Sequence, residues 1–183
     1  MVPAQHALHC HPASACSSVL AVEVSACLAE AGALAVCYRL RGDLAAIRIP
    51  DPASSSARDG LWQHTCLEAF VAAVDGLEYR EFNFSPSGQW AIYCFAACRE
   101  RDLSFVPSVA PQIAFHHCPD GFRLDVVIAP ELLPAGAILN IGLSAVIKAR
   151  DGSKSYWALT HCAAQPDFHL RQSFSLTLQR PAP

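Results

Sequence analysis

Side chains that could do chemistry alternate along one short segment of the sequence. The segment DGLWQHTCLEAFV, residues 59–71, carries Trp62, His64, Cys66 and Glu68 at every second position. Successive side chains of a β-strand point to opposite faces, so on a strand these four would share one face. An indole, an imidazole, a thiol and a carboxylate together are more than a packed core needs, which indicates a binding or reactive surface.

Two catalytic arrangements can be drawn from these residue types. Cys66 and His64 resemble a nucleophile and its base, but side chains two apart on a strand are not usually in hydrogen-bond contact, and no third orienting group can be named. Glu68 and Glu81 have the types of a glycosidase pair, but a hairpin face without an evident cleft is a poor frame for it. The sequence contains no GxSxG, phosphate-loop or dinucleotide pattern. Binding is therefore favoured over catalysis.

Two-residue alternation of apolar side chains predicts the elements that must position these groups. The alternation covers four segments, residues 34–40, 122–128, 139–147 and 174–178. Asp-Gly dipeptides, the strongest short hairpin signal, stand at 59–60, 75–76, 120–121 and 151–152. Together these signals indicate about ten strands and predict an all-β fold, an antiparallel β-sandwich or barrel, in one domain over residues 1–183. Segments 50–58 and 160–172 are expected to be loops.

The register of one hairpin follows if the Asp-Gly pair at 75–76 is a two-residue turn. Glu68 then pairs with Asn83. One face collects apolar residues suited to a core, namely Leu67, Ala69, Val71, Phe82 and Phe84. The opposite face collects Trp62, His64, Cys66, Glu68, Phe70, Tyr79, Glu81 and Asn83. A four-residue turn at 85–88 would add Trp90 to this second face, and a slip of one residue would exchange the two faces.

The second face has the chemistry of a sugar or polyol site. Aromatic rings stack on apolar sugar faces, while carboxylates and amides bond to hydroxyl groups. Glu68 and Glu81 would be diagonal neighbours, and without a cation between them their repulsion favours protonation of one. The alternative is an ordinary sheet face, with these carboxylates solvated or paired with Arg123 or Lys148 on the next strand.

Composition and charge limit the classes of partner. The chain has 183 residues, of which 52% are hydrophobic and 16% charged, so it can bury a sizeable core and is not expected to be disordered. Its net charge is −3 and its Lys and Arg are scattered, which argues against a nucleic-acid surface. No apolar run is long enough to span a bilayer. We therefore expect a small-molecule partner, and neither nucleic acid nor membrane.

The nine cysteines and the first residues bear on the compartment. The stretch MVPAQHALHCHPASAC has no Lys or Arg and no continuous apolar run, so we do not expect it to be a secretory signal. An odd cysteine count without an export signal predicts reduced thiols in the cytoplasm. The cluster of His6, His9, Cys10 and His11 could bind a soft metal, but a structural role is favoured and no metal site is assigned.

Several blocks of the sequence resemble bacterial DOMON-like proteins related to family 9 carbohydrate-binding modules. The blocks are LHCHP, YRLRGDLAAIRIP, DGLWQHTCLEAFV, YREFNFSPSGQWAIY, LSAVIKARDGSKSYWAL and PDFH, and the resemblance runs over most of the chain. It implies a jelly-roll β-sandwich with a ligand site on a sheet face or at its edge. Family 9 modules hold a sugar between two tryptophans, with a glutamate and amides on its hydroxyl groups. In that pattern Trp62 and Glu68 match the first tryptophan and the glutamate, and Trp157 matches the second tryptophan.

Two departures from these relatives leave the ligand open. Relatives that bind sugar or haem are typically exported, and haem-binding DOMON domains use a Met and a His as axial ligands, whereas the only methionine here is Met1. The expected ligand is a small carbohydrate or similar polar molecule, bound by Trp62, His64, Glu68, Glu81, Asn83 and Trp157. The alternatives are a haem-binding domain with His64 or His161 as ligand, and a protein-interaction domain that uses the aromatic face. The cofactor is unknown; haem and calcium are the candidates.

We predict that the nine cysteines are mostly free thiols. Titration of the denatured, unreduced, freshly purified protein with a thiol-reactive chromogen should give close to nine thiols per chain, because a reducing compartment keeps cysteines unpaired. Three or four intact disulfides would contradict the cytoplasmic assignment.

Overall fold

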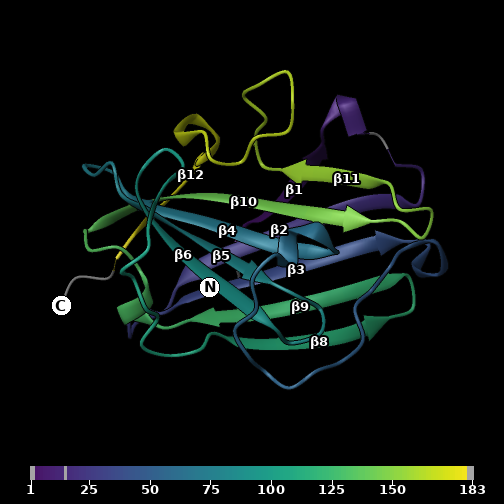
Figure 1. Ribbon diagram of the computed structural model, residues 1–183, viewed down its shortest axis with the longest axis horizontal. Helices are drawn as coiled ribbons and strands as arrows, with labels where there is room; N and C mark the ends of the chain where they lie inside the picture. The colour runs from purple at the N-terminus through teal and green to yellow at the C-terminus, as the bar shows by residue number, and fades with distance from the viewer. Residues whose placement is uncertain (1–2, 15, 181–183) are drawn as a thin grey trace.

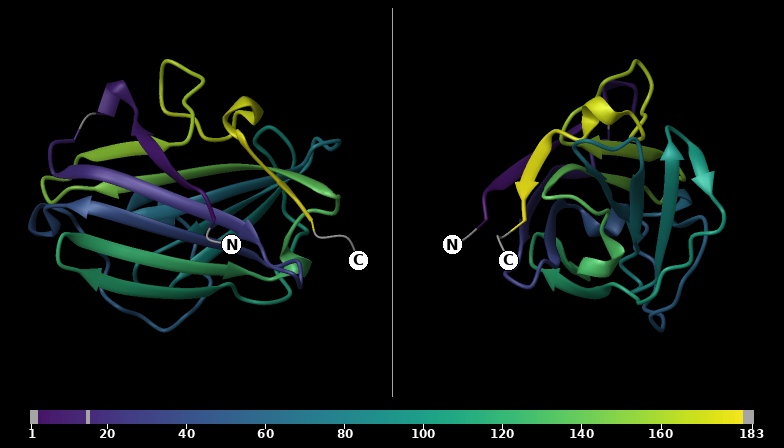
Figure 2. Two further views of the ribbon diagram at one scale, coloured as in Figure 1. Left: turned by 180° about the vertical axis from the view of Figure 1, so that it is seen from behind. Right: turned by 90° about the vertical axis from the view of Figure 1, so that its left-hand side faces the viewer.

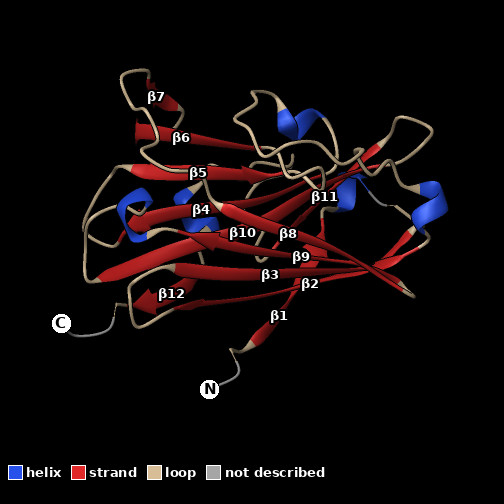
Figure 3. Cartoon of the chain, turned by 90° about the horizontal axis from the view of Figure 1, so that it is seen from below, coloured by secondary structure: helices blue, strands red, loops and turns tan. Residues whose placement is uncertain are grey.

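Antiparallel strands make up the fold. The computed structural model describes residues 3–14 and 16–180. The strands in these residues are β1 (Gln5–Cys10), β2 (Val19–Leu28), β3 (Leu34–Gly42), β4 (Cys66–Ala73), β5 (Tyr79–Phe84), β6 (Trp90–Ala97), β7 (Glu100–Asp102), β8 (Gln112–Cys118), β9 (Gly121–Ile128), β10 (Ile138–Lys148), β11 (Lys154–Ala158) and β12 (Leu176–Gln179). Five short 3-10 helices join them, η1 (Pro12–Ser14), η2 (Leu44–Ala46), η3 (Leu61–Gln63), η4 (Pro130–Leu132) and η5 (Arg171–Ser173) (Figure 3). No helix in the described residues has the length and hydropathy to cross a membrane.

The strands form one continuous hydrogen-bonded sheet, which folds over to make two layers. The strand order is β7-β6-β5-β4-β10-β11-β1-β2-β3-β9-β8, with β12 added beside β10 (Figures 1 and 2). β1 joins the layers, because its residues 9–10 pair with β11 and its residues 5–8 pair with β2. The predicted antiparallel β-sandwich is therefore confirmed.

The core between the layers is built from the inward half of each alternating strand. In β3, for example, the four predicted residues Leu34, Val36, Tyr38 and Leu40 are all buried. The hydroxyl of Tyr38 crosses the core and donates a hydrogen bond of 2.7 Å to the backbone oxygen of Glu68 in β4. A buried phenol needs such a partner, so this bond ties β4 to the opposite layer.

A second, smaller apolar cluster covers the outer face of the layer that contains β4. One edge of β10 pairs with β12 along residues 138–141 and with β11 along residues 144–148. Between these two strands the chain leaves the sheet edge and returns as residues 159–175 (Figure 1). Phe168 and Phe174 in this segment lie with their ring centroids 6.4 and 5.7 Å from that of Phe70. The outer sheet face is therefore partly buried, unlike the solvated face of a simple sandwich.

Three of the four Asp-Gly pairs form hairpin turns as predicted. The pairs at 75–76 and 151–152 lie in the loops that join β4 to β5 and β10 to β11, whereas at 120–121 Asp120 lies in the turn between β8 and β9 and Gly121 is the first residue of β9. The fourth pair does not form a hairpin: Gly60 has a φ of 75° and begins η3. Left-handed backbone suits Gly here as well, so the dipeptide indicates a turn but does not determine whether a strand or a helix comes after it.

The predicted position of Trp90 on the outer face is wrong by one residue. The turn after β5 has three residues, 86–88, because the N–H of Ser85 bonds to the oxygen of Gln89 and Gly88 takes a φ of 91°. Trp90 consequently pairs with Phe84 and packs against the inner core. Hairpins with a three-residue loop use a left-handed Gly in this way.

Substitution of Gly121 should strongly destabilise the fold. A Cβ at Gly121 would collide with the backbone oxygen of Leu40 in β3, so Gly121→Ala should cost about 3 kcal/mol or more in urea denaturation. Gly152→Ala is the matched control, since nothing lies within 4 Å of its Cβ position and only its φ of 94° opposes the change. It should cost about 1–2 kcal/mol. Equal costs for the two variants would contradict the close approach of β3 and β9.

Candidate functional site

The hairpin of β4 and β5 places two glutamates side by side on the outer face. Glu68 pairs with Asn83 and Phe70 pairs with Glu81, in the register predicted from the sequence. Both carboxylate side chains are buried, with Glu68 2% and Glu81 6% exposed. Ionisable groups are rarely buried to this extent without a partner, which singles out this part of the face.

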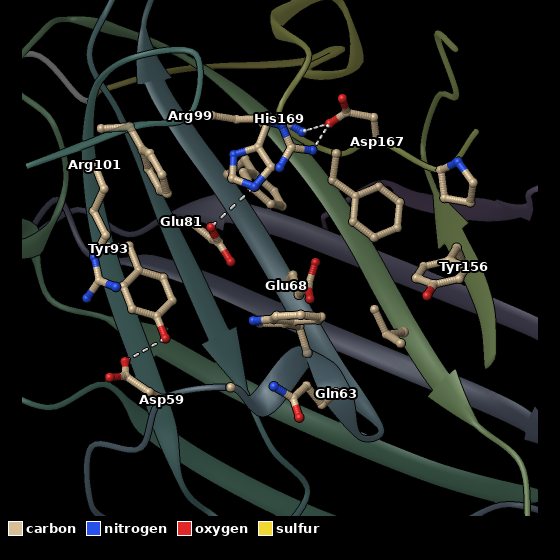
Figure 4. Close-up of a pocket in the computed structure, with 17 residues that line it drawn as sticks. Asp59, Gln63, Glu68, Glu81, Tyr93, Arg99, Arg101, Tyr156, Asp167 and His169 are labelled. Atoms are coloured by element: carbon tan, nitrogen blue, oxygen red, sulfur yellow. Dashed lines mark hydrogen bonds and ion pairs between the residues drawn. The ribbon is translucent and has the colours of Figure 1, made fainter. Parts of the chain in front are cut away.

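A cleft of about 760 Å³ lies over these two side chains, and both line it. Its floor is the outer sheet face, and its ends are formed by residues 59–63 and by residues 166–169 of the segment between β11 and β12. Figure 4 shows the two carboxylates in the middle, with Tyr93 on one side and Tyr156 on the other. This volume is within the range of small-molecule sites.

The structure brings Trp62 to the cleft but leaves His64 outside its lining. Both were expected on a strand, and that expectation is wrong: Trp62 lies in η3, His64 caps it, and β4 begins only at Cys66. Trp62 is 49% exposed and lines the cleft. The ammonium of Lys154 lies over its ring, 5.5 Å from the centroid.

Trp157 does not lie in the cleft, contrary to expectation. It pairs with Ala145, which pairs with Leu67, so its indole points into the core between the layers. It is 7% exposed, and its Nε1 donates to Ser155 Oγ at 2.9 Å. The adjacent Tyr156 points to the outer face and lines the cleft, because neighbouring residues of a strand face opposite ways.

Asn83 supports the site from below and is not among the residues that line the cleft. It is fully buried, and its Nδ2 donates a hydrogen bond of 2.6 Å to Glu81 Oε1. Its Oδ1 accepts from the Cys66 thiol at 3.4 Å. Asn83 therefore holds Glu81 in place rather than presenting its own amide to a ligand.

Burial raises the pKa of both glutamates. For Glu68 the loss of hydration is the main cause and the neighbouring Glu81 carboxylate the second, so its pKa lies well above the ordinary value. The hydroxyl of Ser144 donates to Glu68 Oε2 at 3.3 Å and opposes this effect. The pKa of Glu81 is also raised by burial, against the hydrogen bond from Asn83 and the charges of Arg101 and Arg99.

His169 faces Glu81 as a neutral imidazole. The N–H of Arg99 donates to the Tyr79 hydroxyl at 3.0 Å, and that hydroxyl lies 2.8 Å from His169 Nδ1. If the hydroxyl donates there, the ring proton is on Nε2, which lies 3.7 Å from Glu81 Oε2. Burial, followed by the charge of Arg99, lowers the pKa of His169 to about 4, with Asp167 acting in the opposite direction.

The remaining charged groups of the cleft contact one another or Tyr93. Arg99 bonds to Asp167 at 2.9 Å. The guanidinium of Arg101 lies over the Tyr93 ring, 4.1 Å from its centroid, and the Tyr93 hydroxyl donates to Asp59 at 2.8 Å. These contacts orient both ends of the cleft (Figure 4).

The residues that the sequence did not identify fall into two groups. The first is Tyr93, which lies in β6 and pairs with Glu81 of β5. Gly88 could have indicated this position, because a left-handed Gly is typical of a three-residue hairpin loop, and a loop of that length gives the observed pairing. Arg99, Asp167 and His169 come from loops. His169 belongs to the PDFH block, but no local pattern indicated that residues 160–172 fold over this face.

The histidines considered as haem ligands, and the cations considered as partners of the two glutamates, do not line the cleft. The Nε2 of His161 donates to the backbone oxygen of His9, 2.8 Å away, and neither His161 nor His64 lines the cleft. Arg123 bonds to Asp125, and the Lys148 ammonium donates to the backbone oxygen of Gln63. Neither cation therefore pairs with the glutamates.

In the N-terminal histidine cluster, His11 connects the first strand region to the segment between β11 and β12. His11 is 3% exposed; its Nδ1 accepts the N–H of Ala13, and its Nε2 lies 3.1 Å from the oxygen of Ala163. Within residues 3–14 and 16–180, no group of three or more His, Cys, Asp or Glu side chains is arranged to hold a metal ion.

Solved structures share this fold. The sequence matches no protein-family model and no curated protein. A protein from Bacteroides uniformis for which carbohydrate binding has been suggested aligns with a TM-score of 0.65 at 14% identity, over 98% of this chain and 87% of its own. Family 9 carbohydrate-binding modules from Caldicellulosiruptor kristjanssonii align with TM-scores of 0.55 (13% identity, 93% and 81% coverage, in complex with glucose) and 0.59 (12% identity, 99% and 84% coverage, in complex with cellotriose). At these identities the similarity establishes a common β-sandwich fold.

Protonation of His169 should destabilise the folded protein. Because its pKa is about 4 when folded against 6.5 ordinarily, the unfolded chain binds a proton between these pH values that the folded chain does not. Stability is therefore lost as the pH falls from 6.5 to 4, and His169→Gln removes this contribution. The free energy of unfolding of the wild type minus that of the variant, measured in urea, should fall by about 2 kcal/mol over this range. Parallel pH profiles would show that His169 titrates normally.

Proposed function

We propose that this chain is a non-catalytic binding module for a small carbohydrate, with the cleft over β4 and β5 as its site. The observation that carries the proposal is the placement of two buried carboxylates on the floor of a cleft that an exposed indole also lines. Glu68 and Glu81 are 2% and 6% exposed, while Trp62 is 49% exposed. Sugars present apolar ring faces and a rim of hydroxyl groups, so this combination suits them.

The aromatic groups supply the stacking surface. Lys154 lies over the Trp62 ring, and the Trp62 side chain is half exposed and lines the cleft, so part of its surface is open to a ligand. Tyr156 and Tyr93 line the cleft as well. An aromatic side chain can bury about 150–250 Å², so stacking on one ring gives a small ligand much of its contact area.

The two glutamate side chains can both donate and accept hydrogen bonds. Burial, and then repulsion from Glu81, raise the pKa of Glu68 and favour a proton on it, so the pair combines an O–H donor with acceptor oxygens. A sugar hydroxyl both donates and accepts and can therefore bond to either form. The proposal gains support from the family 9 modules with this fold, which were solved with glucose and with cellotriose.

We also propose that the protein is a DOMON-like module and that it is located in the cytoplasm. The sequence blocks that resemble DOMON-like proteins, among them YREFNFSPSGQWAIY and PDFH, favour a DOMON-like module, and the cysteine pattern favours the cytoplasm. Detection of the full-length native protein in the cytoplasmic fraction of its host is the corresponding test, and its recovery outside the cytoplasm would contradict the assignment.

Removal of the Trp62 ring should abolish most sugar binding. Trp62→Ala removes the stacking surface, so affinity for glucose or cellotriose should fall at least about tenfold, whereas Trp62→Phe should retain part of it. Isothermal titration calorimetry measures the affinity. Because Trp62 is half exposed, the unfolding midpoint should change little.

Leu20→Ala is the matched control for this change. Leu20 is 77% exposed and lies on β2 in the other layer, so sugar affinity should be unaltered. If Trp62→Ala binds sugar as the wild type does, the cleft is not the site. If the wild type binds none of a panel of neutral and charged sugars, the function itself is wrong.

A further inference from the structure

The two buried glutamates have no cationic partner among the described side chains. The nearest basic group is His169, whose Nε2 is 3.7 Å from Glu81 Oε2. Its own burial, followed by the charge of Arg99, lowers its pKa and keeps it neutral. Among the described residues, only one oxygen of Glu68, Oε2, has a hydrogen-bond partner, the Ser144 hydroxyl at 3.3 Å. Buried carboxylates are as a rule paired, so this pair lacks a group that a ligand can supply.

The cations that line or adjoin the cleft are engaged elsewhere. Arg99 is bonded to Asp167 at 2.9 Å. Arg101 lies over the ring of Tyr93. The Lys154 ammonium lies over Trp62, at the end of the cleft formed by residues 59–63. None of these three makes an ion pair with either glutamate among the described residues.

The lining of the cleft as a whole favours a positive ligand. It contains four carboxyl groups, on Asp59, Glu68, Glu81 and Asp167, against two guanidinium groups, on Arg99 and Arg101, so acidic groups remain in excess even when Glu68 carries a proton. Aromatic rings line the same cleft, and their faces attract cations electrostatically. Two of these rings already hold a cation of the protein. An organic ammonium group therefore finds both kinds of partner here.

We propose that the preferred ligand class is an amino sugar, bound with its ammonium group at the Glu68–Glu81 pair and its ring against the aromatic lining. This inference rests on the proposed carbohydrate-binding function and narrows it. A neutral sugar leaves the proton on Glu68, whereas an ammonium ion supplies a positive charge that favours ionisation of both carboxyl groups and offers three N–H donors to their oxygens. Charge-assisted hydrogen bonds are roughly twice as strong as neutral ones, so the ammonium group should determine specificity.

Ligand preference of the unmodified protein gives the first test. Calorimetric titrations near pH 6, where the sugar amine is protonated, would compare glucose, glucosamine and N-acetylglucosamine, and the three corresponding trisaccharides. Glucosamine or its trimer should bind at least about tenfold more tightly than the matching neutral sugars. N-acetylglucosamine separates charge from size, because it carries a substituent at the same carbon without the charge.

The outcomes separate the two proposals. Equal affinity for the neutral and charged sugars overturns the amino-sugar inference and leaves the carbohydrate-binding function standing. No binding of any of the six ligands overturns both. Preference for N-acetylglucosamine over glucosamine also overturns the inference, since it would show that the substituent is recognised by shape.

Charge-removing variants give the second test. Glu68→Gln and Glu81→Gln keep the size of each side chain, and each should bring the ratio of glucosamine affinity to glucose affinity close to one. Glu23→Gln is the control, because Glu23 lies on β2 in the other layer; it should keep the wild-type ratio. An unchanged ratio in both cleft variants would show that the ammonium group lies elsewhere.

Discussion

The register of β4 is the constraint on which the site depends. β4 pairs with β5 on one edge and with β10 on the other, so its side chains have no freedom to exchange faces. Its inward residues belong to the main core, and the Tyr38 hydroxyl holds the backbone oxygen of Glu68 from the opposite layer. The Glu68 carboxylate is thereby directed outward, and the same pairing brings Glu81 next to it.

Such a pair of buried carboxylates lowers stability unless its surroundings compensate. Asn83 donates to Glu81 and Ser144 donates to Glu68, while burial, and then repulsion between the two glutamates, favours uptake of a proton. These bonds offset part of the lost hydration but leave oxygens open to the cleft. Local instability of this kind is typical of binding sites, where a ligand completes the set of partners.

The segment between β11 and β12 converts a sheet face into a cleft. Phe168 and Phe174 pack on Phe70, and this second apolar cluster holds the segment over β4 and β5. Without that cover the glutamates would be solvated, and their pKa values would be close to ordinary ones. The smaller cluster is therefore what gives the site its depth and its low dielectric constant.

The local sequence pattern by itself determined the strands, most of the hairpin turns and the two faces of the β4–β5 hairpin. Alternation with a period of two is a property of neighbouring residues, and the Asp-Gly turn at 75–76 sets the pairing of Glu68 with Asn83 without reference to the rest of the chain. Tertiary structure decided which of these residues meet a ligand. Trp157 points inward because of its pairing with β10, one residue away from Tyr156, which points into the cleft. His169 reaches Glu81 only because a loop far along the sequence packs on Phe70, and such a contact depends on the surface that the folded sheet presents rather than on any pattern within the loop.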